Sequence, residues 1–273
     1  MSRFRFAFSN IAWTPHDDPE VFSLLRRHGI EGIEVAPTAV WGSWEEMTVP
    51  KARAYRRWLG EQGFEAPAMQ AILYGRPQAR LFEAHGEAAL LQHFARVACI
   101  ASGLEARVAV LGAPAQRDRG GRSWPQALEH AAAVLRKAAM LFHDQGCCLC
   151  IEPNPRRYGC NFVNTAAEGI ELVAAVDHPG LRLHLDAAGL YLEREDLAAV
   201  LPAALPVLRH FHVSEPDLGD FRESKVPHTD NLCHLGAAGY AGWCSVEMRR
   251  PSVPLADAGP WTVIASTRSG THA

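Results

Sequence analysis

The stretch Cys148-Leu149-Cys150-Ile151-Glu152-Pro153-Asn154 indicates the fold class of this 273-residue chain. It is a short apolar run that ends on a carboxylate and is followed by a proline. A strand that is buried on both faces gives such a continuous apolar run rather than an alternating pattern. Because a glutamate is almost never buried without a partner, Glu152 at the end of this strand predicts a metal ion, another cation or a substrate beside it.

Seven further segments have strand character, and helical segments separate them. Together with the first stretch, strands are expected at residues 4–8, 33–35, 67–73, 107–111, 148–152, 181–186, 210–213 and 243–247. Helices are expected at residues 19–27, 49–63, 87–102, 123–144, 165–176, 194–208 and 229–239, and within 257–266. Eight alternating units in a chain of this length predict an α/β fold, a single (β/α)8 TIM barrel, rather than an open sheet. We expect one domain over residues 1–273, with a polar tail at residues 267–273.

Net charge, apolar stretches and cysteine content indicate which partners and which cell compartment to expect. The net charge of −3 gives no reason to expect a polyanion as the main ligand, so nucleic acid is not predicted as a partner. No stretch reaches the roughly 20 apolar residues of a membrane span, and the first residues lack the apolar run of a signal peptide. Cys147, Cys148 and Cys150 crowd one buried strand and are expected as reduced thiols in a cytoplasmic protein.

Polar side chains stand where four consecutive strands end. Glu152, Asp186, His212 and Glu247 each follow or interrupt an apolar run, and the carboxyl ends of barrel strands form the usual site. Three carboxylates there would repel one another without a cation. Three carboxylates and one imidazole suit Mn²⁺, Mg²⁺ or Co²⁺ better than structural Zn²⁺, although Zn²⁺ is also compatible. For any one of these acids taken alone, a helix cap or an ion pair with an arginine is the alternative interpretation.

The chain resembles the xylose isomerase-like TIM-barrel superfamily of sugar phosphate isomerases and epimerases, and in particular the ketose 3-epimerases. The matching segments are residues 32–34, 151–154, 161–165, 184–186, 210–215 and 239–248. In ketose 3-epimerases the residues that match Glu152, Asp186, His212 and Glu247 bind one divalent metal. The two matching glutamates are also the acid/base pair on opposite faces of the substrate. The resemblance therefore implies the same catalytic and metal-binding roles for these four residues.

This arrangement fits known proton chemistry. Removal of a proton beside a carbonyl creates an enediolate, which a metal across the carbonyl and hydroxyl oxygens stabilises. A carboxylate on each face inverts the carbon, whereas one carboxylate that moves the proton between adjacent carbons interconverts an aldose and a ketose. The expected function is therefore a divalent-metal-dependent isomerase or epimerase of a small sugar or hydroxy-ketone. The metal motif does not choose between the two reactions or identify the metal.

Three positions depart from the ketose 3-epimerase pattern. Gly189 stands where a substrate-holding histidine is usual, Gly159 where a glutamate is usual, and Leu218 where an arginine is usual. The metal ligands are thus retained while groups that hold the substrate differ. An inosose-type dehydratase in the same fold is the first alternative. An endonuclease IV-like DNA-repair enzyme, which needs more histidines at strand ends, and a binding barrel without catalysis are further alternatives.

Seven other polar residues are candidates for substrate contacts: Glu34, Gln70, Asn154, His184, His210, Arg222 and His228. His184 and His210 precede Asp186 and His212 by two residues, so each pair shares one face of its strand. His184 is equally explained as a buried histidine of the interior, whereas His210 is better explained as a side chain that orients a ligand carboxylate. The sequence does not tell whether the substrate carries a phosphate. A homo-oligomer, common among similar enzymes, is compatible with the chain.

Overall fold

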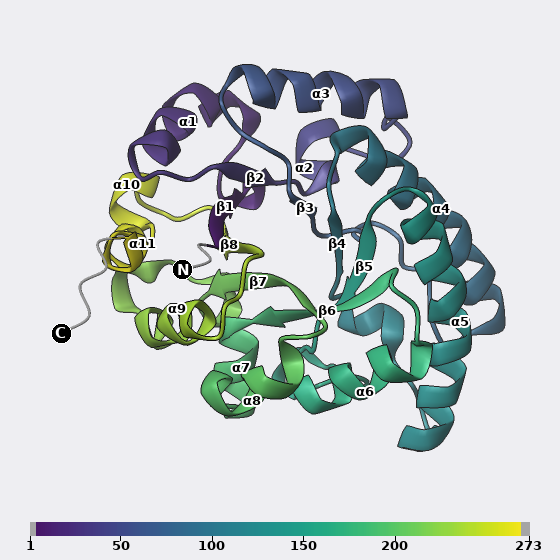
Figure 1. Cartoon of the computed structure of the whole chain (residues 1–273). Helices are drawn as coiled ribbons and strands as arrows, with labels where there is room; N and C mark the ends of the chain where they lie inside the picture. The colour runs from purple at the N-terminus through teal and green to yellow at the C-terminus, as the bar shows by residue number, and fades with distance from the viewer. Residues whose placement is uncertain (1–3, 269–273) are drawn as a thin grey trace.

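The computed structural model of the chain describes residues 4–268 (Figure 1). Its eight parallel strands follow the order β2-β1-β8-β7-β6-β5-β4-β3. Bridges from Gly32 to Glu65 and from Val35 to Met69 connect the two ends of this order, so the sheet closes on itself. The helices lie around the outside of the strands (Figure 1). The predicted (β/α)8 barrel is confirmed.

The strands are β1 (Arg5–Ser9), β2 (Gly32–Glu34), β3 (Ala68–Met69), β4 (Val108–Leu111), β5 (Cys148–Ile151), β6 (Leu181–Asp186), β7 (Leu208–Ser214) and β8 (Trp243–Glu247). The helices are α1 (Asp18–Arg27), α2 (Pro37–Trp41), α3 (Val49–Glu61), α4 (Ala84–Leu104), α5 (Trp124–Asp144), α6 (Ala166–Val176), α7 (Ala187–Glu193), α8 (Leu197–Ala204), α9 (His228–Ala237), α10 (Leu255–Ala258) and α11 (Trp261–Arg268).

The alternation of side chains along each strand sorts the barrel into an inner and an outer layer. Outward-facing residues such as Leu149 and Ile151 belong to the large core between sheet and helices. A separate small cluster fills part of the interior and consists of Ala68, Val108, Val110, Cys148 and Cys150. Glu152 is two residues after Cys150 and therefore faces the barrel interior at the carboxyl end of β5. Its carboxylate thus lies next to the small apolar cluster of the interior.

Several elements differ from those predicted. α7 starts directly after β6, because Asp186 caps it by accepting a hydrogen bond from the Gly189 amide. The helix expected at residues 194–208 is the shorter α8, since Arg194 has a left-handed φ of 59° and Asp196 supplies the cap. β3 ends early because the chain turns at Ala71, whose φ is 52°.

The C-terminal segment also differs from the prediction. Thr267 and Arg268, expected in a polar tail, are the last residues of α11. Residues 269–273 of that predicted tail lie outside the described residues. Across the part of the chain that the structure describes, no helix combines the length and apolarity needed to cross a membrane.

Candidate active site

The four residues predicted as metal ligands come together at the carboxyl ends of β5, β6, β7 and β8. His212 Nδ1 lies 3.2 Å from Glu247 Oε2 and 4.0 Å from Asp186 Oδ2. Ligand atoms of Glu152, Asp186 and His212 all lie within 4.8 Å of one another. Glu247 joins this group through its contact with His212. Carboxylate oxygens and one imidazole nitrogen at this spacing fit a single shared divalent cation.

Two acids of this group, Glu152 and Asp186, lie in surroundings that disfavour their charge. Burial, followed by the nearby Asp186 and Glu247, raises the pKa of Glu152 to about 8. Burial also raises the pKa of Asp186, and Glu247 adds to that effect. Burial opposes ionisation of His212, yet Glu34 and Glu247 raise its pKa well above the usual value. Converging carboxylates with raised pKa values are the electrostatic pattern that a divalent cation would relieve.

Two glycines contribute to the positions of the Glu152 and Asp186 carboxylates. A Cβ atom on Gly112, directly after β4, would lie 2.5 Å from Glu152 Oε2, so any other residue there would displace this carboxylate. The Gly189 amide donates to Asp186 Oδ1 at 2.6 Å, while the Ser214 hydroxyl donates to Oδ2. Asp186 is therefore a helix cap through one oxygen, and its other oxygen faces His212. The helix-cap and metal-ligand interpretations of Asp186 are compatible.

Glu34 contacts the ring nitrogen of His212 that points away from Glu247. Its side chain is fully buried, and its oxygens lie 2.9 and 3.1 Å from His212 Nε2. Burial opposes ionisation of Glu34, but His212 and His210 hold its pKa well below the usual range. A proton on Nε2 donates to Glu34 and leaves the Nδ1 lone pair free for a metal. Glu34 is thus placed to select the tautomer of His212 that a metal ligand requires.

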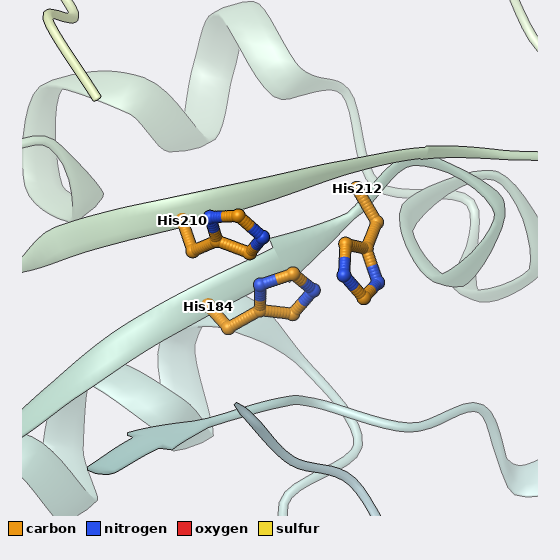
Figure 2. A group of neighbouring side chains, drawn as sticks. All are labelled: His184, His210 and His212. Carbon is orange, nitrogen blue, oxygen red and sulfur yellow. The ribbon is translucent and has the colours of Figure 1, made fainter. Parts of the chain in front are cut away.

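His184 and His210 lie beside His212 in the interior, on β6 and β7 (Figure 2). They are 0% and 1% exposed. Glu34, His184 and His210, three of the candidates for substrate contacts, therefore lie beneath the carboxylates rather than on the surface of the mouth.

Two adjoining cavities open over the metal-ligand candidates, with volumes of about 520 and 490 Å³. Both are lined by Gly112, Ala113, Glu152, Leu218 and Glu247. The first continues over polar residues: Asn154, Tyr158, Asp186, Ser214, Glu215, Asp217 and Arg249. The second continues over mainly apolar residues: Ile11, Gln70, Ala71, Ile72, Leu73, Tyr74 and Val110. Cavities of this size accommodate a small organic substrate, and both proposed proton carriers face both of them.

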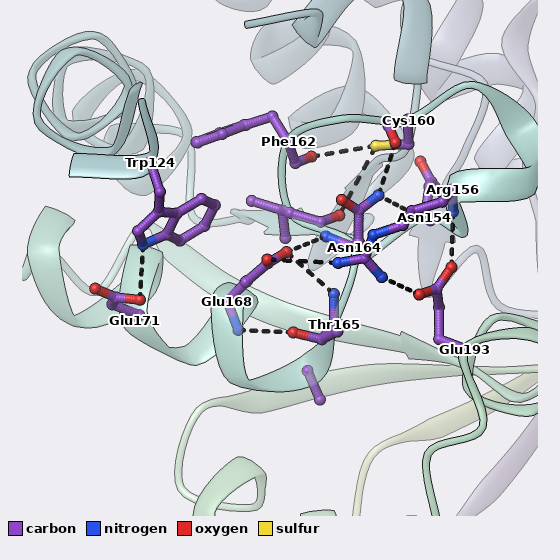
Figure 3. A network of polar contacts seen from close by, with 12 residues as sticks. Trp124, Asn154, Arg156, Cys160, Phe162, Asn164, Thr165, Glu168, Glu171 and Glu193 are labelled. Carbon is purple, nitrogen blue, oxygen red and sulfur yellow. Dashed lines mark hydrogen bonds and ion pairs between the residues drawn. The ribbon is translucent and has the colours of Figure 1, made fainter. Parts of the chain in front are cut away.

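The loop after β5 is held by a polar network (Figure 3). The Asn164 side chain donates to the Asn154 and Cys160 carbonyls, both at 2.9 Å. Glu168 accepts from the Asn164 and Thr165 amides, and this closes the capping box of α6. The backbone at Asn154, two residues after Glu152, is therefore fixed rather than free to follow the substrate.

Arg117 stabilises the same loop from β4's side and was not predicted from the sequence. It belongs to the short 3-10 helix η3 (Pro114–Arg117) and is 2% exposed. Its Nη2 donates to the Glu152 carbonyl at 2.7 Å and to Asn154 Oδ1 at 2.6 Å. No periodic pattern surrounds Arg117 in the sequence, so only its position in the fold reveals this role.

The remaining substrate-contact candidates occupy different environments. Gln70 lines the second cavity, and its amide donates to the Ser9 hydroxyl. His228 is buried, and its Nε2 lies 2.8 Å from Glu215 Oε1, a contact that ties down the loop after β7. Arg222 is exposed and forms an ion pair with Asp220 at 2.7 Å. Neither His228 nor Arg222 lines the two cavities, so the structure does not bring them to Glu152 and Glu247.

In protein stripped of metal, stability is expected to fall as the pH rises from about 4.5 to about 8. In this window the folded state keeps Glu152 protonated, while the unfolded chain has released that proton. The folded state then binds more protons, so the free energy of unfolding decreases by up to about 1.4 kcal/mol per pH unit. Melting temperatures of wild type and Glu152→Gln between pH 5 and 8 measure the difference. Equal pH slopes in both proteins would contradict the assignment to Glu152.

Comparisons with known proteins agree with the barrel. A family model described as xylose isomerase-like TIM barrel matches residues 22–265. The chain is 25% identical over 130 residues to a ketose 3-epimerase of Arthrobacter globiformis, and 25% identical over 114 residues to the D-psicose 3-epimerase of Ruminiclostridium cellulolyticum. These matches cover 48% and 42% of this chain but only 45% and 39% of the relatives, so the chain matches less than half of each relative's length.

Solved structures show the same fold at lower identity. A D-psicose 3-epimerase structure determined in the presence of D-fructose has a TM-score of 0.78 at 17% identity, covering 97% of this chain and 99% of that one. A structure described as a probable 3-DHS dehydratase from Bacillus anthracis has a TM-score of 0.70 at 15% identity, covering 98% and 99%. At such identities the likeness concerns the fold alone.

Proposed function

Because the chain belongs to the xylose isomerase-like TIM barrel family, we propose that it is a divalent-metal-dependent epimerase or isomerase of a small sugar or hydroxy-ketone. The observation that carries the proposal is the pair Glu152 and Glu247. Both line the same two cavities, and Asp186 and His212 lie on the strands between them. The curated relatives named as 3-epimerases support this class of reaction.

The proposed metal is held by Glu152, Asp186, His212 and Glu247. Their donor set of carboxylate oxygens and one imidazole fits Mn²⁺, Mg²⁺ or Co²⁺, and Zn²⁺ is compatible. A divalent cation bound there would supply Lewis-acid stabilisation of the negative charge that develops on the substrate oxygens. Glu34 contributes by keeping the proton of His212 on Nε2, and Gly189 and Ser214 contribute by orienting the two oxygens of Asp186.

The proton transfer is assigned to the two glutamates. They reach the cavities from β5 and β8, which β6 and β7 separate, so they approach a bound ketone from different sides. If one takes the proton beside the carbonyl and the other returns a proton to the opposite face, the carbon inverts. If one carboxylate carries the proton to the neighbouring carbon, the product is the aldose or ketose isomer.

Dehydration is the second candidate, because Leu218 and Gly189 stand where the ketose 3-epimerase pattern has side chains that hold the substrate. Leu218 lines both cavities at the place where an arginine was expected from the ketose 3-epimerase pattern. Gly189 binds Asp186 through its backbone and offers no side chain to a substrate. The same proton abstraction beside a ketone, followed by loss of a hydroxyl group from the next carbon, gives a dehydratase.

Incubation of the metal-loaded protein with pentuloses, hexuloses and an inosose in D₂O separates these reactions. Deuterium at C3 of a ketose indicates 3-epimerisation, and deuterium at C1 or C2 indicates isomerisation. Loss of water from the inosose, seen as an enone absorbance, indicates the dehydratase. Metal-loaded protein that promotes neither exchange nor water loss with any of these compounds would count against the proposed class.

A further inference from the structure

Beneath the candidate active site, the barrel interior holds three imidazoles and a carboxylate. His184, His210, His212 and Glu34 are each 0–1% exposed. Ring nitrogens of the three histidines lie within 4.8 Å of one another. Figure 2 shows the three rings projecting from β6 and β7 into one space, with ring nitrogens of His184 and His210 directed toward His212. This group is defined here as the interior histidine cluster.

Hydrogen bonding within the interior histidine cluster is incomplete. Neither ring nitrogen of His184 has a hydrogen-bond partner among residues 4–268. His210 Nε2 lies 3.2 Å from Glu34 Oε1 without forming an aligned hydrogen bond. A neutral imidazole carries one N–H donor and one lone pair, and leaving a buried group of this kind without a partner destabilises the folded state. Native proteins normally complete such groups with an ion, a ligand or a water.

We propose that Glu34, His184, His210 and His212 bind a second divalent metal ion, distinct from the one assigned to Glu152, Asp186, His212 and Glu247. Three imidazoles and one carboxylate form a four-coordinate donor set that suits Zn²⁺. Ligand atoms about 2.0–2.1 Å from a tetrahedral Zn²⁺ lie about 3.3 Å apart. The distances from Glu34 oxygens to His210 Nε2 and His212 Nε2 are 2.9–3.2 Å, so a small outward movement of these side chains makes room for the ion.

His212 connects the two metal positions. Its Nδ1 faces Glu247 and Asp186, and its Nε2 faces Glu34. When both nitrogens are bound to metal, the ring loses its N–H proton to solvent and becomes an imidazolate. The second ion then occupies the place of the Nε2 proton, whose hydrogen bond Glu34 accepts when the ion is absent. The charges balance, since Glu34 and the imidazolate together offset one divalent cation in a space that is closed off from bulk solvent.

The two positions differ in chemistry. The position formed by Glu152, Asp186, His212 and Glu247, called here the upper position, offers three carboxylates, which favour harder ions such as Mn²⁺ and Mg²⁺. The position in the interior histidine cluster, called here the interior position, is rich in imidazole. The inference does not rest on the proposed reaction, because it concerns ligands that do not line the cavities. Its test can therefore be separated from any test of activity.

The experiment counts Zn²⁺ per chain in protein whose upper position is disabled by Glu152→Gln together with Glu247→Gln. Stripped protein is incubated with Zn²⁺, freed of excess by gel filtration and analysed by inductively coupled plasma mass spectrometry. We expect about two ions in wild type, one in the double variant, and none when His184→Phe is added. His143→Phe, at an exposed position on α5, is the matched control and should keep the ion.

A Co²⁺ titration gives a second measurement, the visible absorption of bound Co²⁺, which does not depend on folding alone. Tetrahedral Co²⁺ with imidazole ligands absorbs strongly in the visible range, so the band should appear in the double variant and disappear with His184→Phe. Circular dichroism checks that His184→Phe is folded, and His184→Asn provides a polar replacement if it is not. A double variant that binds no Zn²⁺, or that retains it after His184 is replaced, would overturn the second metal position, and a buried water would then complete His184.

Discussion

Replacing Glu247 by glutamine is expected to slow substrate proton exchange by about 10²–10⁴-fold, the usual contribution of a positioned acid or base. Glutamine has nearly the same shape as glutamate but does not accept a proton at neutral pH. Glu247 is also a proposed ligand through its contact with His212, so the measurement needs Mn²⁺ in excess and a parallel metal count. Loss of deuterium incorporation with the metal still bound would assign the proton transfer to Glu247 itself.

The control for this variant lies on the loop after β7. Glu223, in the 3-10 helix η6 (Phe221–Glu223), is exposed and outside the cavities, so Glu223→Gln changes the same net charge without changing the site. We expect Glu223→Gln to retain wild-type exchange. Glu247→Gln should keep a cooperative unfolding transition, since glutamine has nearly the same shape as glutamate and Glu247 is the last residue of β8. Exchange at the wild-type rate in folded Glu247→Gln would refute its role as a proton carrier.

The barrel could be predicted because each buried strand leaves a clear trace in the sequence. The run from Cys148 to Ile151 is apolar without alternation, and β8 matches its predicted bounds of residues 243–247. A helix start could also be predicted where a side chain caps the helix, as Thr165 does at the start of α6. β3 was predicted too long because it ends where Ala71 adopts a left-handed backbone conformation. Alanine rarely adopts this conformation, so the sequence does not indicate the turn.

The predicted metal ligands are residues at the ends of strands, and the position of such a residue follows from the barrel fold. Asp186 is such a residue, and the fold brings it to His212 as expected. Arg117 could not be found in this way, because its contact with the Glu152 carbonyl depends on how a loop folds back. Arg222 is the opposite case, a basic residue of the loop after β7 that pairs with its neighbour Asp220 and does not line the two cavities.

Removal of divalent metal is expected to reduce turnover to background, and Mn²⁺ should restore it. Without a cation, Glu152, Asp186 and Glu247 share one small space, and Glu152 takes up a proton with a pKa of about 8. An ion that binds only the folded state stabilises it by about 2.7 kcal/mol at 100 times its dissociation constant. For a chain of this size that corresponds to a rise of roughly 5–10 °C in melting temperature. Full activity in protein shown to be metal-free would contradict the prediction.

Asp186→Asn separates a metal ligand from a structural cap. The asparagine oxygen can still accept the hydrogen bond from the Gly189 amide, so the start of α7 should survive. The substitution removes one negative charge from a group of repelling acids, so metal-free Asp186→Asn should melt no lower than metal-free wild type. With Mn²⁺ present the order should reverse, because the variant loses a charged ligand and most of the metal-induced rise. A purely structural Asp186 would instead give the same change in melting temperature with and without the ion, and calorimetry under both conditions distinguishes the two.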